Sequence, residues 1–135
     1  MEARHMKSIE EQASRLDKEY LAITLLFDQF CQQAVVLAEQ YHFFCWPDDE
    51  EARPQCRAFT LFGEDRELVL HCQAGESGAL IGFARIRDGE GRLLASLGFD
   101  AEGQLLLSRG RLLDQAADQL LGLLLGAMVP LPPAP

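Results

Sequence analysis

The sequence has no basic segment. Its 135 residues hold 12 lysines and arginines against 21 aspartates and glutamates, which gives a formal net charge of −9 at pH 7. Acids outnumber bases in residues 1–45, in the acidic run at 48–51 and in the rest of the chain alike. Nucleic-acid binding depends on a positive surface that displaces counterions from phosphate groups. We therefore expect no nucleic acid among the partners of this protein.

Long apolar runs are also missing. No uninterrupted stretch approaches the roughly 20 apolar residues that a membrane-spanning helix needs. Residues 1–18 are polar and mixed in charge, unlike a secretory signal peptide. We therefore expect a cytoplasmic protein that does not contact a membrane. In that compartment its four cysteines, Cys31, Cys45, Cys56 and Cys72, stay reduced.

Asparagine is absent, and lysine occurs only twice against ten arginines and 23 leucines. This bias indicates a bacterial genome rich in G and C, and it says nothing about function. Hydrophobic residues make up 48% of the chain and charged residues 24%, as in an ordinary soluble globular protein. A chain of this length forms one domain, residues 1–135, and buries roughly two-thirds of its unfolded surface.

Glycine and proline do not occur in residues 1–46. Apolar residues recur there at spacings of four and three from Ile9 to Phe44, which predicts a long helix with one buried stripe. The middle of this helix, "YLAITLLF" at 20–27, is apolar nearly all round. More than one of its faces should therefore be covered.

The limits of this helix follow from the residues at its ends. Ser8 and Glu11 form a capping box at the start, and Pro47 disfavours helical geometry in the residue before it. A helix over residues 8–45 is roughly 55 Å long, whereas a compact domain of this size has a diameter of about 35–40 Å. Such a helix either bends or breaks, or its free end packs against another chain; we expect the excess length to lie in a dimer contact.

The apolar period changes to two after an acidic loop at residues 46–55. Short turns that contain glycine separate the alternating segments, and connections this short join only antiparallel neighbours. The pattern therefore predicts a five-stranded antiparallel meander. Its strands are predicted at residues 56–62, 67–73, 79–87, 92–99 and 104–109.

The last predicted element is a second helix at residues 111–128, which Pro130 ends and a proline-rich tail at 130–135 follows. Its leucines cover more than one face, so we expect a partner to cover part of this surface. The predicted fold is α+β: a long N-terminal helix, a five-stranded antiparallel meander sheet, and a C-terminal helix packed on the sheet.

The densest group of chemically active residue types is "YHFFCWPDDEE" at residues 41–51. Five side chains in and beyond it are possible zinc ligands: His42, Cys45, Cys56, His71 and Cys72. Their spacing matches no compact zinc motif, and neighbouring strand residues such as His71 and Cys72 point to opposite faces. Free cysteine is among the most buried residue types, so we expect all four cysteines in the core.

No catalytic motif is present either. Cys45 and His42 lie one helical turn apart in the predicted helix, but no third group orients them as a nucleophile pair. The acids at 48–51 are typical of a solvated run, and no nucleophile motif surrounds Ser77 or Ser96. The glycine turns lack the pattern of a phosphate-binding loop. We therefore assign no catalytic, cofactor-binding or metal-binding residue.

Two segments resemble class I type III secretion chaperones. "LLASLGFDAEGQLLLSRGRLLDQAADQLLGLLLGAM" at 93–128 is similar to the strand, acidic glycine turn, leucine-rich strand and amphipathic helix that close those proteins. "LFGEDRELVLHCQ" at 61–73 resembles their early hairpin. The resemblance implies a small acidic homodimer without catalytic activity, which binds an extended segment of another protein over hydrophobic patches. The turn "DGEG" at 88–91 leaves no room for the middle helix of that family.

Three classes of function remain open. The first is a non-enzymatic protein-binding module, chaperone-like or adaptor-like, that acts as a homodimer. The second is a domain that binds a small apolar ligand in a pocket between the sheet and the helices. The third is an unrecognised enzyme or metal protein that uses His42, Cys45 or His71.

The first two classes have candidate residues. The partner or dimer surface is predicted at Leu16, Tyr20, Leu121 and Leu125. The alternative ligand pocket is predicted at Phe27, Phe30, Phe59, Phe83 and Phe99. The simplest interpretation of these phenylalanines is packing in the core.

Overall fold

The computed structural model of the chain describes residues 2–47 and 55–128, with side chains from residue 9 onward. Most of the predicted acidic loop and all of the proline-rich tail lie outside these ranges. The elements in chain order are α1 (Glu2–Gln40), β1 (Phe44–Cys45), β2 (Cys56–Leu61), β3 (Glu64–Ala74), β4 (Leu80–Asp88), β5 (Leu93–Asp100) and α2 (Ala116–Gly126). The predicted α+β fold, with its two helices and its five-stranded antiparallel sheet, is confirmed.

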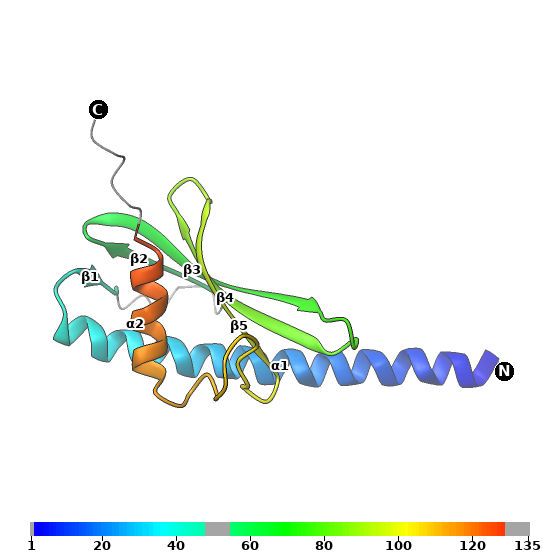
Figure 1. The fold of residues 1–135 in the computed structure, drawn as a ribbon. Helices are drawn as coiled ribbons and strands as arrows, with labels where there is room; N and C mark the ends of the chain where they lie inside the picture. Colours follow the sequence, from blue (N-terminus) through cyan, green and yellow to red (C-terminus); the bar gives the residue numbers. More distant parts are fainter. Residues whose placement is uncertain (1, 48–54, 129–135) are drawn as a thin grey trace.

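α1 is one continuous helix of 39 residues that runs along the sheet and then projects past it (Figure 1). Two hydrogen bonds tie it to the hairpin between β3 and β4. Arg15 Nη2 donates to the Gly78 carbonyl oxygen over 3.3 Å, and Glu19 Oε2 accepts the Leu80 N–H over 2.8 Å. The helix residues before Arg15 add roughly 20 Å of rod beyond this hairpin.

Both predicted ends of this helix are wrong. Ser8 lies inside α1, because the residues before it contain no helix breaker and continue the helix. At the other end, α1 stops at Gln40. The chain turns there to place Phe44 on the sheet, where it pairs with Leu61. The apolar spacing continues as far as Phe44, but its burial in β1 decides its conformation.

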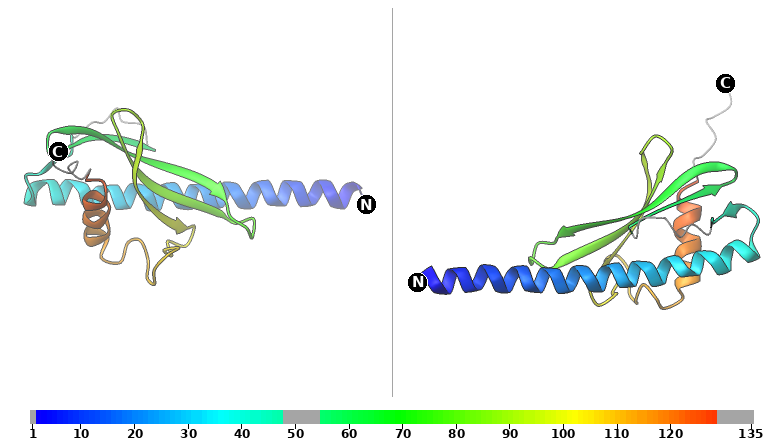
Figure 2. Two further views of the ribbon diagram at one scale, coloured as in Figure 1. Left: turned by 45° about the horizontal axis from the view of Figure 1, so that its top comes forward. Right: turned by 180° about the vertical axis from the view of Figure 1, so that it is seen from behind.

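The sheet is an open, twisted meander in the order β1-β2-β3-β4-β5, and each neighbouring pair is antiparallel (Figure 2). The predicted strand at 104–109 is wrong, because this segment forms only two isolated bridges, Phe99↔Leu105 and Gln104↔Arg111. Asp100 Oδ1 accepts the N–H groups of residues 102 and 104 and closes a tight turn. β1 is the remaining strand of the five.

One face of the sheet packs on the helices. α1 contributes five buried residues at the predicted helical spacing: Ile23, Phe27, Phe30, Ala34 and Leu37. The strands contribute Phe59, Leu61, Leu68, Leu70, Ala84, Ile86 and Phe99. The predicted seam is therefore confirmed over residues 23–37, where α1 lies on the sheet.

α2 begins at Ala116, five residues later than predicted. The residues before it form turns that bury Leu112, whose N–H donates to the Gly103 carbonyl oxygen over 2.6 Å. Gln115 has a left-handed backbone with φ 53°, which prevents the helix from starting earlier. α2 packs beside α1 and on β5, and it buries Ala116, Leu120, Leu123 and Leu124.

α1 is also long and apolar enough to cross a membrane. Within Ile9–Gln40 an 18-residue window has a mean hydropathy of 1.5, and a third of that window is buried in the fold. The expectation of no spanning segment considered only uninterrupted apolar runs and did not anticipate this. Length and composition are weak evidence for a span, because the core helix of a soluble protein meets the same criteria.

Candidate protein-binding site

The chemically active side chains do not gather into one site. His42 and Cys45 are exposed, after the end of α1 and in β1 respectively. His71 and Cys72 point to opposite faces of β3: His71 faces the Phe83 ring, and Cys72 packs against the core. In the part of the chain that the structure describes, no group of three or more His, Cys, Asp or Glu side chains is placed to hold a metal ion.

The four cysteines differ in burial, so the expectation that all four lie in the core is wrong for Cys45. Cys31 is buried, Cys56 and Cys72 are half-buried, and Cys45 is exposed. Burial, partly offset by the charge of Arg57, raises the pKa of the Cys31 thiol to about 12. Burial also raises the pKa of Cys72. Both thiols are protonated at neutral pH and are therefore poor nucleophiles.

The predicted phenylalanine pocket is divided between the two faces of the sheet. Four of its members are buried in the core: Phe27, Phe30, Phe59 and Phe99. Phe83 lies on the opposite, open face, because its neighbours in β4, Gly82 and Ala84, take the buried positions. The Arg85 guanidinium lies 4.8 Å from the centre of the Phe83 ring on that face. The five phenylalanines therefore do not line a single pocket, because Phe83 lies on the other face of the sheet from the remaining four.

The four residues of the predicted partner surface also differ in exposure. Leu125 is 56% exposed on α2, whereas Leu121 packs against the core. Leu16 is half-buried on α1, and the Tyr20 hydroxyl accepts a hydrogen bond of 2.6 Å from Gln55 Nε2. Leu125 is the member of this set that fits an unoccupied surface best.

β5 is the last strand of the sheet, and part of its outer edge is open. Near its end the edge is occupied: the Gly98 carbonyl accepts the Leu106 N–H over 3.1 Å, and the Asp100 N–H donates to the Gln104 carbonyl over 3.0 Å. Backbone groups of alternate strand residues point to the same edge. The backbone N–H and C=O groups of Ser96 therefore also point to the outer edge. No described residue forms a backbone hydrogen bond with them on that side.

A groove runs beside this open edge, between β5 and α2. We call it the β5–α2 groove; its volume is about 350 Å³. It is lined by Leu94, Ala95, Ser96, Leu97, Asp118, Gln119, Gly122, Leu123 and Gly126. A Cβ at Gly122 would meet no atom within 4 Å, and one at Gly126 would contact Ala95 Cβ at 3.7 Å. The two glycines thus keep this side of α2 open and close to the strand.

This groove was not among the sites predicted from the sequence. The sequence feature that could have indicated the groove is the pair Gly122 and Gly126, four residues apart inside a leucine-rich helix. Glycine inside a helix lowers its stability and usually marks a close approach or a functional surface. No sequence feature indicated the open edge at Ser96, because the segment at 104–109 was expected to pair with that edge as a strand.

Three aromatic side chains, of which Tyr41 and Phe62 are exposed and Phe43 is half-buried, form a second surface at the end of α1. The Phe43 ring stacks on the Phe62 ring at a centroid distance of 5.4 Å and lies 5.5 Å from the Tyr41 ring. Phe62 is 58% exposed and has φ 50°, a left-handed conformation that bulky residues rarely adopt. The turn that it forms with Gly63 therefore carries local strain.

A polar pocket of about 370 Å³ lies at the ends of β2, β3 and β4. Three ion pairs involve residues in or next to it: Arg66–Glu64, Arg87–Glu67 and Arg92–Asp88. The backbone N–H of Arg92 is the main cause that lowers the pKa of Asp88. Each of these three arginines has a carboxylate partner, so none of them offers an unpaired positive charge to an anion.

No family model, curated protein or solved structure matches the chain. The resemblance to class I type III secretion chaperones therefore stays a prediction from the residues, and function has to be argued from the β5–α2 groove and the helix surfaces.

Proposed function

We propose that the chain is a non-enzymatic protein-binding module that holds an extended segment of another protein in the β5–α2 groove and works as a homodimer. The observation that carries this proposal is the open edge of β5 at Ser96, beside a groove between strand and helix. An unpaired strand edge is completed by another strand, with backbone hydrogen bonds for affinity and side-chain pockets for specificity.

The shape of the groove favours one kind of segment. Residues 94–97 of β5 offer a partner strand roughly 13 Å of edge, which corresponds to about four residues. Alternate side chains of the partner would point toward α2, where Gly122 leaves open space. Asp118 lines the groove and favours a basic residue in the segment. The net charge of −9 adds long-range attraction for such a segment.

The composition of the groove supports binding rather than catalysis. Its polar side chains are one hydroxyl, one carboxylate and one amide, from Ser96, Asp118 and Gln119. No histidine, lysine or cysteine is among the lining residues. The Ser96 hydroxyl thus has no histidine or lysine within the groove to activate it as a nucleophile.

The test begins with peptides selected from a random 12-residue library by binding to the purified chain. Affinity for the best peptide is then measured by fluorescence anisotropy for the wild type and for Gly122→Leu, which fills the groove. We expect Gly122→Leu to weaken binding by at least about tenfold, since it displaces the side chains of the peptide. Gly122→Ala is the matched control, because it gains the same helix propensity but adds little volume.

A second variant tests the backbone pairing. Ser96→Pro removes the outward N–H of an edge residue, a position where proline is tolerated in sheets. We expect it to weaken the peptide about tenfold, whereas Ser96→Ala retains wild-type affinity. Peptides that bind both Gly122→Leu and Ser96→Pro as tightly as the wild type would contradict the proposed site.

A further inference from the structure

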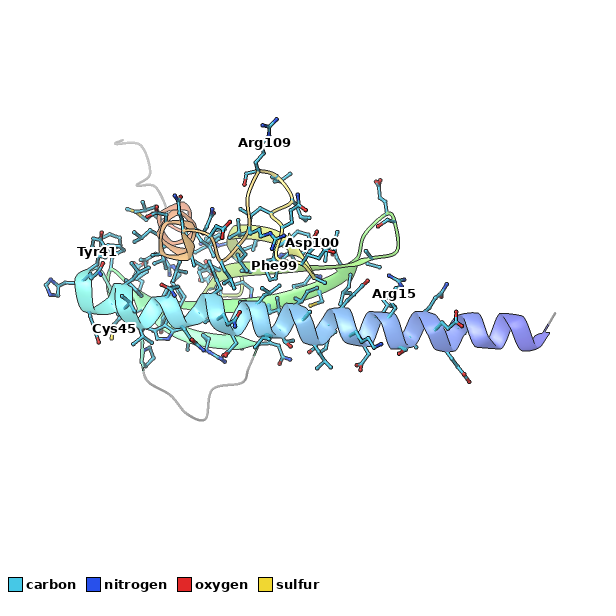
Figure 3. All side chains as sticks on the ribbon, turned by 90° about the horizontal axis from the view of Figure 1, so that it is seen from below. Arg15, Tyr41, Cys45, Phe99, Asp100 and Arg109 are labelled. Carbon is cyan, nitrogen blue, oxygen red and sulfur yellow. The ribbon has the colours of Figure 1, made fainter. Side chains whose placement is uncertain are left out.

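α1 has a second apolar face on the side turned away from the sheet. Leu21 and Leu25 are 58% and 59% exposed there, and Val35 and Val36 are 52% and 47% exposed. On a helix with 3.6 residues per turn Leu25 and Val36 lie opposite the fully buried Phe27. Leu21 and Val35 lie to one side, roughly 120° and 80° around the helix from Phe27. Figure 3 looks onto this side of α1, and no other described element crosses it. The sheet therefore covers only one of the two apolar faces of the helix.

The exposed face has a defined order of residues. Alternate spacings of three and four give Lys18, Leu21, Leu25, Asp28, Gln32, Val35 and Glu39, with Val36 next to Val35. We call these eight residues the outer stripe. Such a heptad spacing is typical of a helix that packs lengthwise against another helix. The two ends of the outer stripe carry opposite charges, Lys18 at one end and Glu39 at the other, and both are exposed.

We propose that two copies of the chain pack antiparallel through the outer stripe, as a dimer with twofold symmetry. In this arrangement Lys18 of each copy lies within about one helical turn of Glu39 of the other. The leucines near the Lys18 end then meet the valines near the Glu39 end of the second copy. Each contact occurs twice, because a twofold interface uses the same surface on both subunits.

The charges select the antiparallel orientation. A parallel pair would place Lys18 beside Lys18 and Glu39 beside Glu39, and like charges across an interface disfavour association. Asp28 lies near the middle of the outer stripe and does not distinguish the two orientations. Its Oδ1 atom is 3.3 Å from Arg57 Nη2 of the same chain, which offsets its charge.

The fold leaves room for this dimer. The outer stripe spans roughly 33 Å of helix, and the sheets of the two copies lie on opposite, outer sides of the helix pair. The projecting N-terminal turns of each copy extend past the end of α1 of the other. Four aliphatic side chains per copy form a small contact, so we expect a dissociation constant in the range of roughly 1–100 µM.

This dimer deepens the self-association in the proposed function and does not depend on the β5–α2 groove. All residues that line the groove belong to β5 and α2, so the groove stays accessible in the dimer. A chain that dimerises but binds no peptide would contradict the proposed binding site alone. A chain that binds peptide as a monomer would contradict the dimer alone.

The test is charge reversal at the two ends of the outer stripe, measured by sedimentation velocity from 1 to 200 µM. A reducing agent is included, because Cys45 is exposed and can form disulfides between chains. Lys18→Glu and Glu39→Lys each replace two attractions by two repulsions, so we expect each to weaken the dimer about tenfold or more. The double variant Lys18→Glu/Glu39→Lys restores both attractions and should dimerise like the wild type.

Mixing the two single variants gives a sharper result. Lys18→Glu supplies two acids and Glu39→Lys two bases, so an equimolar mixture should form a heterodimer although each variant alone is mainly monomeric. The homodimers distinguish the two orientations. In a parallel dimer the wild type and both single variants would each carry two like-charged pairs, so a single charge reversal would not weaken the dimer. Arg109→Glu and Glu102→Lys are exposed residues off the stripe and control for the change in net charge.

Three outcomes would overturn the proposal. The first is a wild-type chain that stays monomeric at 200 µM. Binding of that monomer to phosphatidylcholine vesicles would indicate that a lipid surface, and not a second copy, covers the outer stripe. The second is a dimer that the single charge reversals do not weaken relative to the controls. The third is a mixture of single variants that forms no heterodimer. Leu25→Glu, at a site that is 59% exposed in the monomer, should also abolish the dimer while the circular dichroism spectrum is unchanged.

Discussion

Gly82 of β4 lies directly beneath Ile23 of α1: a Cβ atom built at Gly82 would be 2.6 Å from Ile23 Cγ2. The same atom would be 3.1 Å from Phe99 Cζ, in the strand on the other side. Ile23 and Phe99 are both fully buried, so neither can move into solvent. The absence of a side chain at Gly82 therefore sets how closely α1 approaches the sheet.

The first prediction follows from this contact. Gly82→Ala should lower the free energy of unfolding by about 1–3 kcal/mol, because the added methyl group overpacks the core between helix and sheet. Urea denaturation followed by circular dichroism measures the change. Gly122→Ala is the control: it adds the same methyl group in open space and should raise stability by about 0.5–1 kcal/mol. A Gly82→Ala variant as stable as the wild type would show that α1 is not held this close.

The second prediction concerns the strained turn at Phe62. Its φ of 50° disfavours residues with a side chain, whereas its ring gains a stacking contact with Phe43. Phe62→Ala loses the stacking and keeps the strain, while Phe62→Gly loses the stacking and relieves the strain. We expect Phe62→Gly to be more stable than Phe62→Ala by about 1 kcal/mol in thermal or urea unfolding. The reverse order would mean that this turn does not adopt the left-handed conformation in solution.

The elements that depend on local pattern were predictable from the sequence. The spacing of three and four over residues 23–37 identified the buried face of α1, because a helix buries one stripe wherever it lies on a sheet. The alternation in β2 to β5 likewise predicted four of the five strands and their antiparallel order. In these segments the local period and the tertiary contacts favour the same structure.

The remaining elements depend on contacts between distant residues. Phe44 continues the helical spacing, but its pairing with Leu61 places it in β1. The leucine-rich segment at 104–109 has the composition of a strand, yet it pairs with β5 only as far as Leu106, and Leu107 is fully exposed. The β5–α2 groove exists only because this segment leaves part of the β5 edge open, so its position could not be derived from a local pattern.

The third prediction concerns the part of α1 that projects beyond the sheet. A chain that starts at Ser14 retains the Arg15 and Glu19 hydrogen bonds to the β3–β4 hairpin. It should unfold within about 3 °C of the full chain, because the deleted residues project past that hairpin and add little to the core. The outer stripe begins at Lys18, so the proposed dimer should also persist in sedimentation velocity. Loss of the dimer would place the self-association on the projecting turns instead.

The last prediction uses the titration of Cys31. In the unfolded chain its thiol has an ordinary pKa of 9.0, and burial raises this pKa to about 12 in the folded protein. Below pH 9 both states hold the proton, and Cys31 adds no pH dependence. Between pH 9 and 12 the unfolded state loses the proton first, so stability should fall by up to about 1.4 kcal/mol per pH unit.

Other groups titrate in the same range, so the contribution of Cys31 is isolated by a variant. Cys31→Ala removes the thiol and should unfold at lower urea concentration at pH 8, because it leaves a small cavity in the core. Its stability should then decline less steeply than that of the wild type between pH 9 and 11, and the two curves should converge. Parallel curves would mean that the thiol is solvated in the folded protein, which would contradict the tight packing of α1 on the sheet around Cys31.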